Sequence, residues 1–181
     1  METNKKTLFL NSLTFGALTG IALILLSTLI YLLGMDNKSP LQYLTYVIFI
    51  VGIAWGTKYY KDVNLRGFIS YGTSFLSGFY IGIIAGAIAS VFTFILVKWV
   101  DPIIINKILE QAEEKLIEKY PDWPQQQLDS AMAMTKKFTT PVWMASLSLL
   151  SNTIVSIIFS LIIAIFMKKK DESFEGFVEN N

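Results

Sequence analysis

Residues 70–90 read SYGTSFLSGFYIGIIAGAIAS, and this stretch decides how the rest of the chain is interpreted. Small residues recur in it at every fourth position: Ser70, Ser74, Gly78, Gly82, Gly86 and Ser90. Four residues are slightly more than one helical turn, so these residues form a single groove along a helix. The uncharged segment around them extends from Gly67 to Val97. Such a segment predicts a membrane span that another helix can approach closely.

Charged residues are unevenly distributed along the chain. They make up 16% of its 181 residues, against about 25% in ordinary soluble domains. Four segments carry no charge at all: 7–35, 39–57, 67–97 and 138–167. Each is long enough to cross a hydrocarbon core of roughly 30 Å, which takes about 20 helical residues. We therefore predict an all-α, polytopic membrane protein with four transmembrane helices, at about 8–33, 40–58, 67–98 and 140–167.

The connection between the third and fourth spans is longer than the other two. Asp101-Pro102 is typical of a helix start. Apolar residues then recur at helical spacing as far as Tyr120, with glutamates on the other faces. We predict extramembrane amphipathic helices over about 102–137, lying along the outer membrane surface. Residues 1–170 would form a single four-helix transmembrane domain, and residues 171–181 a short, acidic, disordered tail.

The composition argues against several kinds of chemistry. The chain has no histidine and no cysteine, so it lacks the commonest acid–base group and any thiol. Its net charge of +1 gives no reason to expect nucleic acid. Glu110, Glu113 and Glu114 lie on neighbouring turns, which indicates a solvated helix face; a divalent-cation site or an interfacial enzyme is the alternative there. We expect a protein that is not an enzyme and that uses neither a cofactor nor a metal.

Two further segments repeat small or polar residues at the same spacing. In the last span they are Ser148, Asn152, Ser156, Ser160 and Ala164, and in the first span Ser12, Gly16 and Gly20. We interpret both stripes as helix packing, in which small residues allow close approach and hydroxyls bond across helices. The alternative is a path for a polar solute, favoured most by Asn152, whose amide needs partners. Our hypothesis is that the Ser70–Ser90 groove takes one of these two stripes.

Basic residues predict the orientation of the bundle. With four spans both termini lie on one side, where the segment ends carry eight basic residues: Lys5, Lys6, Lys58, Lys61, Arg66, Lys168, Lys169 and Lys170. The segment ends on the opposite side carry four basic residues: Lys38, Lys98, Lys136 and Lys137. The third connection adds three more on that side: Lys107, Lys115 and Lys119. This distribution favours both termini in the cytoplasm.

The chain also resembles a known family. At Ile69–Phe79, at Ala85-Gly86 and at Trp99–Pro102 it is similar to the bacterial four-span membrane proteins described as domain of unknown function 4199. The resemblance covers about residues 5–170 and implies an integral protein of the bacterial inner (cytoplasmic) membrane. The resemblance implies no catalytic residue. It implies only that five residues are important in the family: Tyr71, Gly72, Gly78, Asp101 and Pro102.

Two functions are compatible with these observations. The one we favour is a non-catalytic structural or interaction component of the membrane, whose groove has the spacing of a glycine zipper. Its partners would be the lipid bilayer and other membrane proteins or a second copy of the chain. The alternative is a small-solute carrier or pore formed by an oligomer. The spans contain no ionisable Asp, Glu, Lys, Arg or His, which disfavours a proton-coupled carrier.

Overall fold

The structure is a computed structural model that describes residues 5–34, 41 and 43–169. All regular elements in these residues are helices, apart from an isolated antiparallel bridge between Ile69 and Lys169. The all-α prediction is therefore confirmed. The predicted disordered tail, 171–181, and most of the connection between the first two spans lie outside the described residues.

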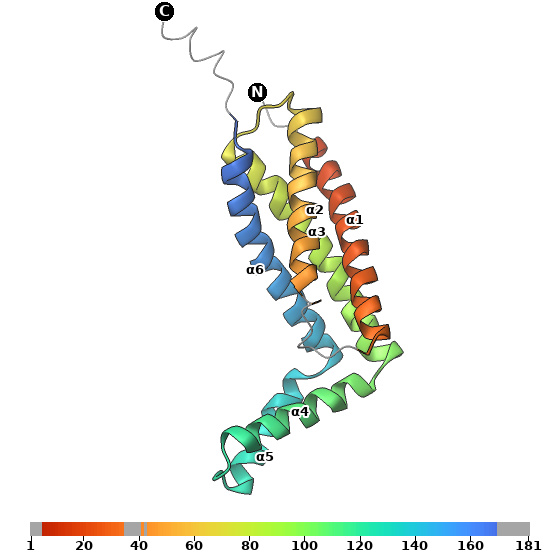
Figure 1. Ribbon diagram of the computed structural model, residues 1–181, viewed down its shortest axis with the longest axis vertical. Coiled ribbons are helices and arrows are strands. Elements are labelled where there is room, and N and C mark those ends of the chain that lie inside the picture. The colour runs from red at the N-terminus through yellow and green to blue at the C-terminus, as the bar shows by residue number, and fades with distance from the viewer. Residues whose placement is uncertain (1–4, 35–40, 42, 170–181) are drawn as a thin grey trace, which may run out of the picture. The chain divides into compact units, whose positions relative to one another are not determined.

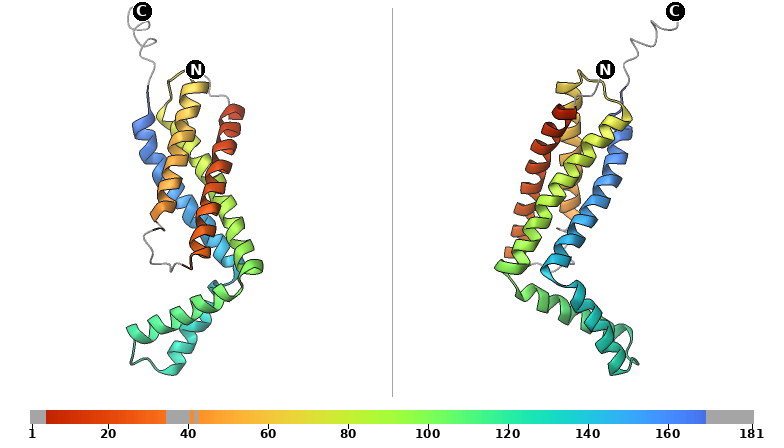
Figure 2. Two further views of the ribbon diagram at one scale, coloured as in Figure 1. Left: turned by 45° about the vertical axis from the view of Figure 1, so that its right-hand side comes forward. Right: turned by 180° about the vertical axis from the view of Figure 1, so that it is seen from behind.

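The chain forms two compact units, one of residues 1–89 with 151–181 and the other of residues 90–150. In the first unit four helices lie side by side (Figures 1 and 2). They are α1 (Lys5–Leu32), α2 (Tyr43–Tyr59), α3 (Tyr71–Ile95) and α6 (Pro141–Met167). The last residues of α3 and the first residues of α6 belong to the second unit.

Three helical stretches are long and apolar enough to cross a membrane: Lys5–Leu32, Tyr71–Val100 and Pro141–Met167. They correspond to the first, third and fourth predicted spans. Helix α2, with 17 residues, is not among them. The described chain therefore has candidate helices for three spans, and the second span stays a prediction.

The helices of the first unit alternate in direction. Leu8, Tyr60 and Ile69 belong to one buried cluster, and Met167 packs against it. Leu8 lies near the start of α1 and Tyr60 directly follows α2, whereas Ile69 precedes α3 and Met167 ends α6. The start of α1 and the end of α6 therefore lie at the same end of the bundle as the α2–α3 connection.

The connection from α2 to α3 is tight. After α2 a π-helical turn, Tyr60–Asn64, continues the helix. The chain then reverses through Arg66 and Gly67, with φ of 53° and 89°, and the Gly67 N–H donates to the Lys61 carbonyl at 2.9 Å. Glycine adopts this left-handed conformation at little steric cost. The turn thus places Ser70 directly before α3, where its hydroxyl accepts a hydrogen bond from the Thr73 N–H at 3.2 Å.

The interior of the first unit contains an apolar cluster to which all four helices contribute. This buried cluster consists of Phe15, Leu23, Phe49, Ile53, Ile81, Ala85 and Ile163. The outer faces are apolar as well: Leu25 is 65% exposed and Phe166 is 81% exposed. Large exposed apolar surfaces are unusual on soluble monomers. They are expected where a helix bundle faces lipid.

The second unit contains a helical hairpin that follows a π-helical turn, Leu96–Val100. Its helices are α4 (Ile103–Lys119) and α5 (Gln125–Phe138), which contact each other. The Asp101 carboxylate accepts a hydrogen bond from the Ile103 N–H at 3.1 Å, so it caps α4. At the turn between the helices the rings of Tyr120 and Trp123 stack with their centroids 4.2 Å apart.

Candidate functional site

The contact between α3 and α6 brings together two of the stripes found in the sequence. Gly78, Gly82 and Gly86 face Ser160, Ser156 and Asn152 respectively. The residue number falls by four on α6 as it rises by four on α3, as antiparallel helices require. A Cβ atom on Gly78 would lie 2.7 Å from the Ser160 Oγ, and one on Gly86 would lie 2.7 Å from the Asn152 Cβ. Only glycine fits at these positions without moving α6, so the two backbones approach closely.

Gly82 is the tightest of the three positions. A Cβ atom there would meet the Ser156 side chain, with the Ser156 Cβ only 2.5 Å away. Ser156 is fully buried, and its hydroxyl donates to the Phe79 carbonyl at 3.2 Å. The contact thus combines close approach with a hydrogen bond across the helices. We call the three glycines and their three partners on α6 the glycine seam.

The serines of the predicted groove have different environments. Ser70 is exposed and caps α3 from outside the helix, whereas Ser74 is buried. Ser90 belongs to the second unit, where its hydroxyl donates to the Ala145 carbonyl at 2.6 Å. In the stripe of α6, Ser148 is half-buried and belongs to the second unit. The close contact of the first unit therefore depends on the glycines.

The stripe of α1 packs on another part of α3. A Cβ atom on Gly16 would lie 2.7 Å from the Ile84 Cβ, and one on Gly20 would lie 2.9 Å from the Ile88 Cβ. The Ser12 hydroxyl donates to the Ser77 carbonyl at 3.4 Å. Helix α3 therefore contacts both stripes, with its glycines against α6 and its isoleucines against α1.

Among the described residues of the first unit, five buried polar side chains each have one oxygen atom without a hydrogen-bond partner. They are Asn11 (Oδ1), Thr57, Ser74, Ser77 and Ser160. Ser74 and Ser160 belong to the four-residue stripes found in the sequence, whereas no sequence pattern predicted the five residues as a set. A four-residue repeat finds positions on one helix face, whereas Thr57 and Ser77 belong to no such repeat. Buried unpaired polar groups are uncommon, so each of them needs an explanation.

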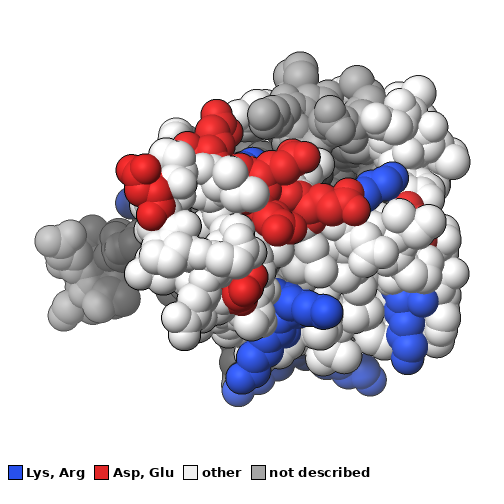
Figure 3. All heavy atoms as spheres, turned by 90° about the horizontal axis from the view of Figure 1, so that it is seen from below, with Lys and Arg blue, Asp and Glu red and all other residues white. Residues whose placement is uncertain are grey.

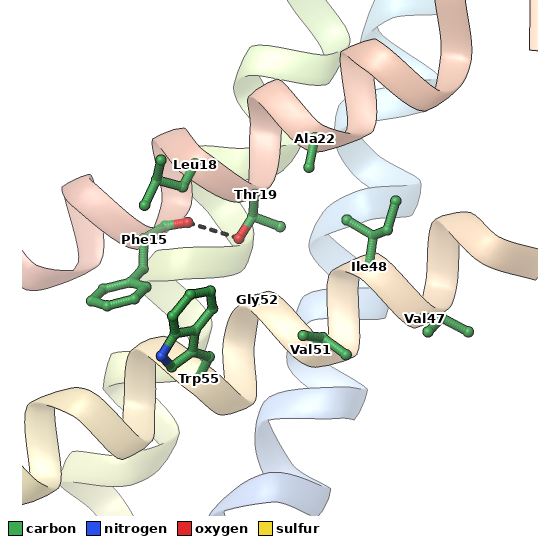
Figure 4. A pocket seen from close by; sticks show the side chains of 9 residues that line it. All are labelled: Phe15, Leu18, Thr19, Ala22, Val47, Ile48, Val51, Gly52 and Trp55. Carbon is green, nitrogen blue, oxygen red and sulfur yellow. Dashed lines mark hydrogen bonds between the residues drawn. The ribbon is translucent and has the colours of Figure 1, made fainter. Parts of the chain in front are cut away.

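Helices α1 and α2 enclose an apolar groove of about 290 Å³ (Figure 4). Nine residues line it: Phe15, Leu18, Thr19, Ala22, Val47, Ile48, Val51, Gly52 and Trp55. The Thr19 hydroxyl donates to the Phe15 carbonyl at 2.7 Å, so the wall presents no unpaired hydroxyl. The Phe15 ring meets the Trp55 and Tyr59 rings, at centroid distances of 5.9 and 5.2 Å. Chemically, the groove suits an alkyl chain.

The hairpin of the second unit carries a large share of the acidic residues. Glu110, Glu113 and Glu114 are all exposed on α4. In Figure 3 several acidic side chains form one group, whereas other acidic side chains and most of the visible basic side chains lie apart from it. Among the described residues, no group of three or more acidic, histidine or cysteine side chains is arranged to hold a metal ion.

Comparison with known proteins finds one family. The family described as "Protein of unknown function (DUF4199)" matches residues 14–169. No curated protein and no solved structure matches the chain.

Proposed function

The chain belongs to the DUF4199 family of proteins of unknown function, and on this premise we propose that it is a non-catalytic membrane protein that acts through contacts with other proteins. Three long apolar helices indicate a membrane protein. The interaction role is proposed for the exposed α4–α5 hairpin.

We propose that α2 is the second of four spans. The observation that supports it is the buried cluster of Leu8, Tyr60 and Ile69 with Met167 against it. Because the start of α1 and the start of α3 lie at one end of the bundle, the chain must return along α2 between them. No charged residue lies between Tyr43 and Thr57, and the π-helical turn that follows extends the helix to Asn64.

We propose a bacterial inner membrane with this end of the bundle in the cytoplasm. The end carries Lys58, Lys61, Arg66, Lys168 and Lys169 within a few residues of the helix ends. Basic residues close to spans are retained on the cytoplasmic side. With four spans, the connection over about 102–137 would then be on the outer side of the membrane.

Single cysteines test this topology, because the chain contains no cysteine of its own. We would label Glu113→Cys and Lys61→Cys in intact cells with a thiol reagent that does not cross membranes. We expect Glu113→Cys to react in intact cells and Lys61→Cys only after permeabilisation. Equal labelling of both positions before permeabilisation would contradict four spans with cytoplasmic termini.

We propose that the α4–α5 hairpin is the part that meets partners. Ile117 is 51% exposed and Met134 is 65% exposed, although both are apolar. The test is a photo-crosslinking residue at Met134, with Glu118 on the charged surface as the matched control position. We expect a discrete protein adduct in membranes from Met134 and a weaker one from Glu118. Crosslinking to lipid alone at Met134 would leave the hairpin as a membrane-surface element and contradict the interaction role.

The second candidate function is a small-solute carrier or pore formed by an oligomer. The observation that favours it is the set of five buried oxygens without partners. An aqueous path along α6 would expose Asn152 and Ser156 to solvent within the assembly. Single cysteines at these positions would then react with a soluble thiol reagent, and complete protection of both would rule out the path.

A further inference from the structure

The five unpaired oxygens are unusual within this chain. Elsewhere, hydroxyls bond the carbonyl four residues earlier in their own helix, as in these pairs: Thr14–Leu10, Thr19–Phe15, Ser130–Gln126, Thr135–Ala131, Thr139–Thr135 and Ser146–Val142. Others bond across helices, as Ser12 and Ser156 do. The hydroxyls of Thr57, Ser77 and Ser160 do neither, although all three side chains are 0% exposed.

The residues that carry these oxygens come from all four helices of the first unit, and contacts of these residues or of their sequence neighbours link the four helices. The Asn11 amide donates to the Gly56 carbonyl at 3.1 Å, which joins α1 to the residue before Thr57 on α2. The neighbouring Ser12 hydroxyl reaches the Ser77 carbonyl on α3 at 3.4 Å.

Helix α6 is linked to these residues through α3. A Cβ atom on Gly78, next to Ser77, would lie 2.7 Å from the Ser160 Oγ and 2.9 Å from the Ile53 Cγ2. Ser74 lies one turn before Gly78 on α3. We call the five residues Asn11, Thr57, Ser74, Ser77 and Ser160 the oxygen cluster.

The chemistry of the cluster suggests the kind of ligand. Every unpaired atom is an oxygen with a free lone pair, and the Asn11 Oδ1 can only accept. A buried water typically makes about three hydrogen bonds, so a single water does not satisfy five oxygens. Calcium and magnesium sites in proteins draw on carboxylates, and the cluster has none. A partly dehydrated monovalent cation can be coordinated by several neutral oxygen atoms at once.

We propose that the oxygen cluster binds an alkali-metal cation inside the bundle. The ion would be held by the amide oxygen of Asn11 and the hydroxyls of Thr57, Ser77 and Ser160, with Ser74 one turn away. Binding joins all four helices. The proposed ion site depends only on the packing of the first unit, so it is independent of the proposed interaction role of the hairpin.

The experiment is thermal unfolding of the full chain in detergent, with sodium chloride, potassium chloride and choline chloride compared at equal ionic strength. Choline is a quaternary ammonium ion whose methyl groups keep oxygen atoms away from its charge, so it serves as the reference cation. A ligand that binds only the folded state raises the unfolding midpoint as its concentration rises. We expect sodium or potassium to raise the midpoint by several degrees above choline, with saturation. Equal midpoints in the three salts would overturn the proposal and leave the oxygens to water.

Two variants separate ion binding from ordinary packing. In Ser160→Ala, we expect the salt-dependent rise to be lost, while the midpoint in choline stays at or above that of the wild type, because an unpaired buried hydroxyl has been removed. The matched control on the same helix is Ser146→Ala, whose exposed hydroxyl bonds its own backbone at 2.8 Å. It should keep the full rise. A rise that survives in Ser160→Ala and in Asn11→Leu would overturn the site.

Discussion

The glycine seam and the α4–α5 hairpin are built on opposite principles. In the seam, Gly82 and Ser156 bring two helices so close that a single added carbon collides. In the hairpin, α4 has no buried side chain, and Leu128 is the buried side chain of α5. The seam tolerates almost no increase in side-chain volume, whereas most positions on the hairpin surface can accept a larger side chain. The comparison indicates that an added side chain is costly in the seam and tolerated over most of the hairpin surface.

The largest effect should come from filling the seam. Gly82→Leu adds a side chain where even a Cβ atom meets Ser156, so α3 and α6 must separate. We expect a loss of about 3 kcal/mol or more, at the upper end of what overpacking costs. Thermal unfolding in detergent measures it. The matched control is Gly72→Leu on the same helix, where nothing lies within 4 Å of the added carbon. Unfolding of Gly82→Leu at the wild-type midpoint would show that the seam does not hold the bundle.

A smaller effect should come from the turn of the hairpin. Trp123→Ala removes a ring that stacks on Tyr120 at 4.2 Å, and such aromatic pairs contribute about 0.5–1.5 kcal/mol. Amide hydrogen exchange should become faster in α4 and α5 only. Trp123→Phe, which keeps an aromatic ring, should restore most of the protection. Faster exchange in α1 as well would mean that the two regions are not energetically separate.

A still smaller effect should follow from removing one hydrogen bond in the seam. Ser156→Ala loses the bond to the Phe79 carbonyl but keeps the Cβ atom that faces Gly82. We expect a cost of about 0.6 kcal/mol, the average for hydrogen bonds between membrane helices. Chemical unfolding in detergent, with Ser146→Ala as control, measures it. A cost as large as that of Gly82→Leu would mean that the seam depends on polarity and not on volume.

The smallest effect should come from the charged face of the hairpin. Glu113→Gln changes an exposed side chain, and surface substitutions of this kind stay within about 0.5 kcal/mol. The unfolding midpoint should not change measurably. Glu114→Gln, on the same face, should behave in the same way. A large loss of stability in either variant would show that the acidic face is held by contacts within the protein.

Parts of the fold could be predicted because they depend on local pattern. Asp101-Pro102 was predicted to start a helix, and the Asp101 carboxylate does cap α4. Ser70 shows the limit of such reasoning, because its spacing placed it in the groove whereas the structure places it before α3 as a cap. Helix ends shift easily by one or two residues, and a repeat of four carries no information about where the helix begins.

By itself, the sequence determined that the chain is helical and apolar enough for a membrane. The reason is that its uncharged segments are as long as a membrane-spanning helix. It also determined which residues share a helix face, because 3.6 residues per turn sets that geometry. Only the tertiary structure decided that Gly82 of α3 meets Ser156 on α6, while isoleucines of α3 meet α1. It also brought Asn11 of α1 to the Gly56 carbonyl of α2, which its amide reaches at 3.1 Å. The physical reason is that periodicity defines a surface on one helix, whereas the neighbour depends on how all four helices pack.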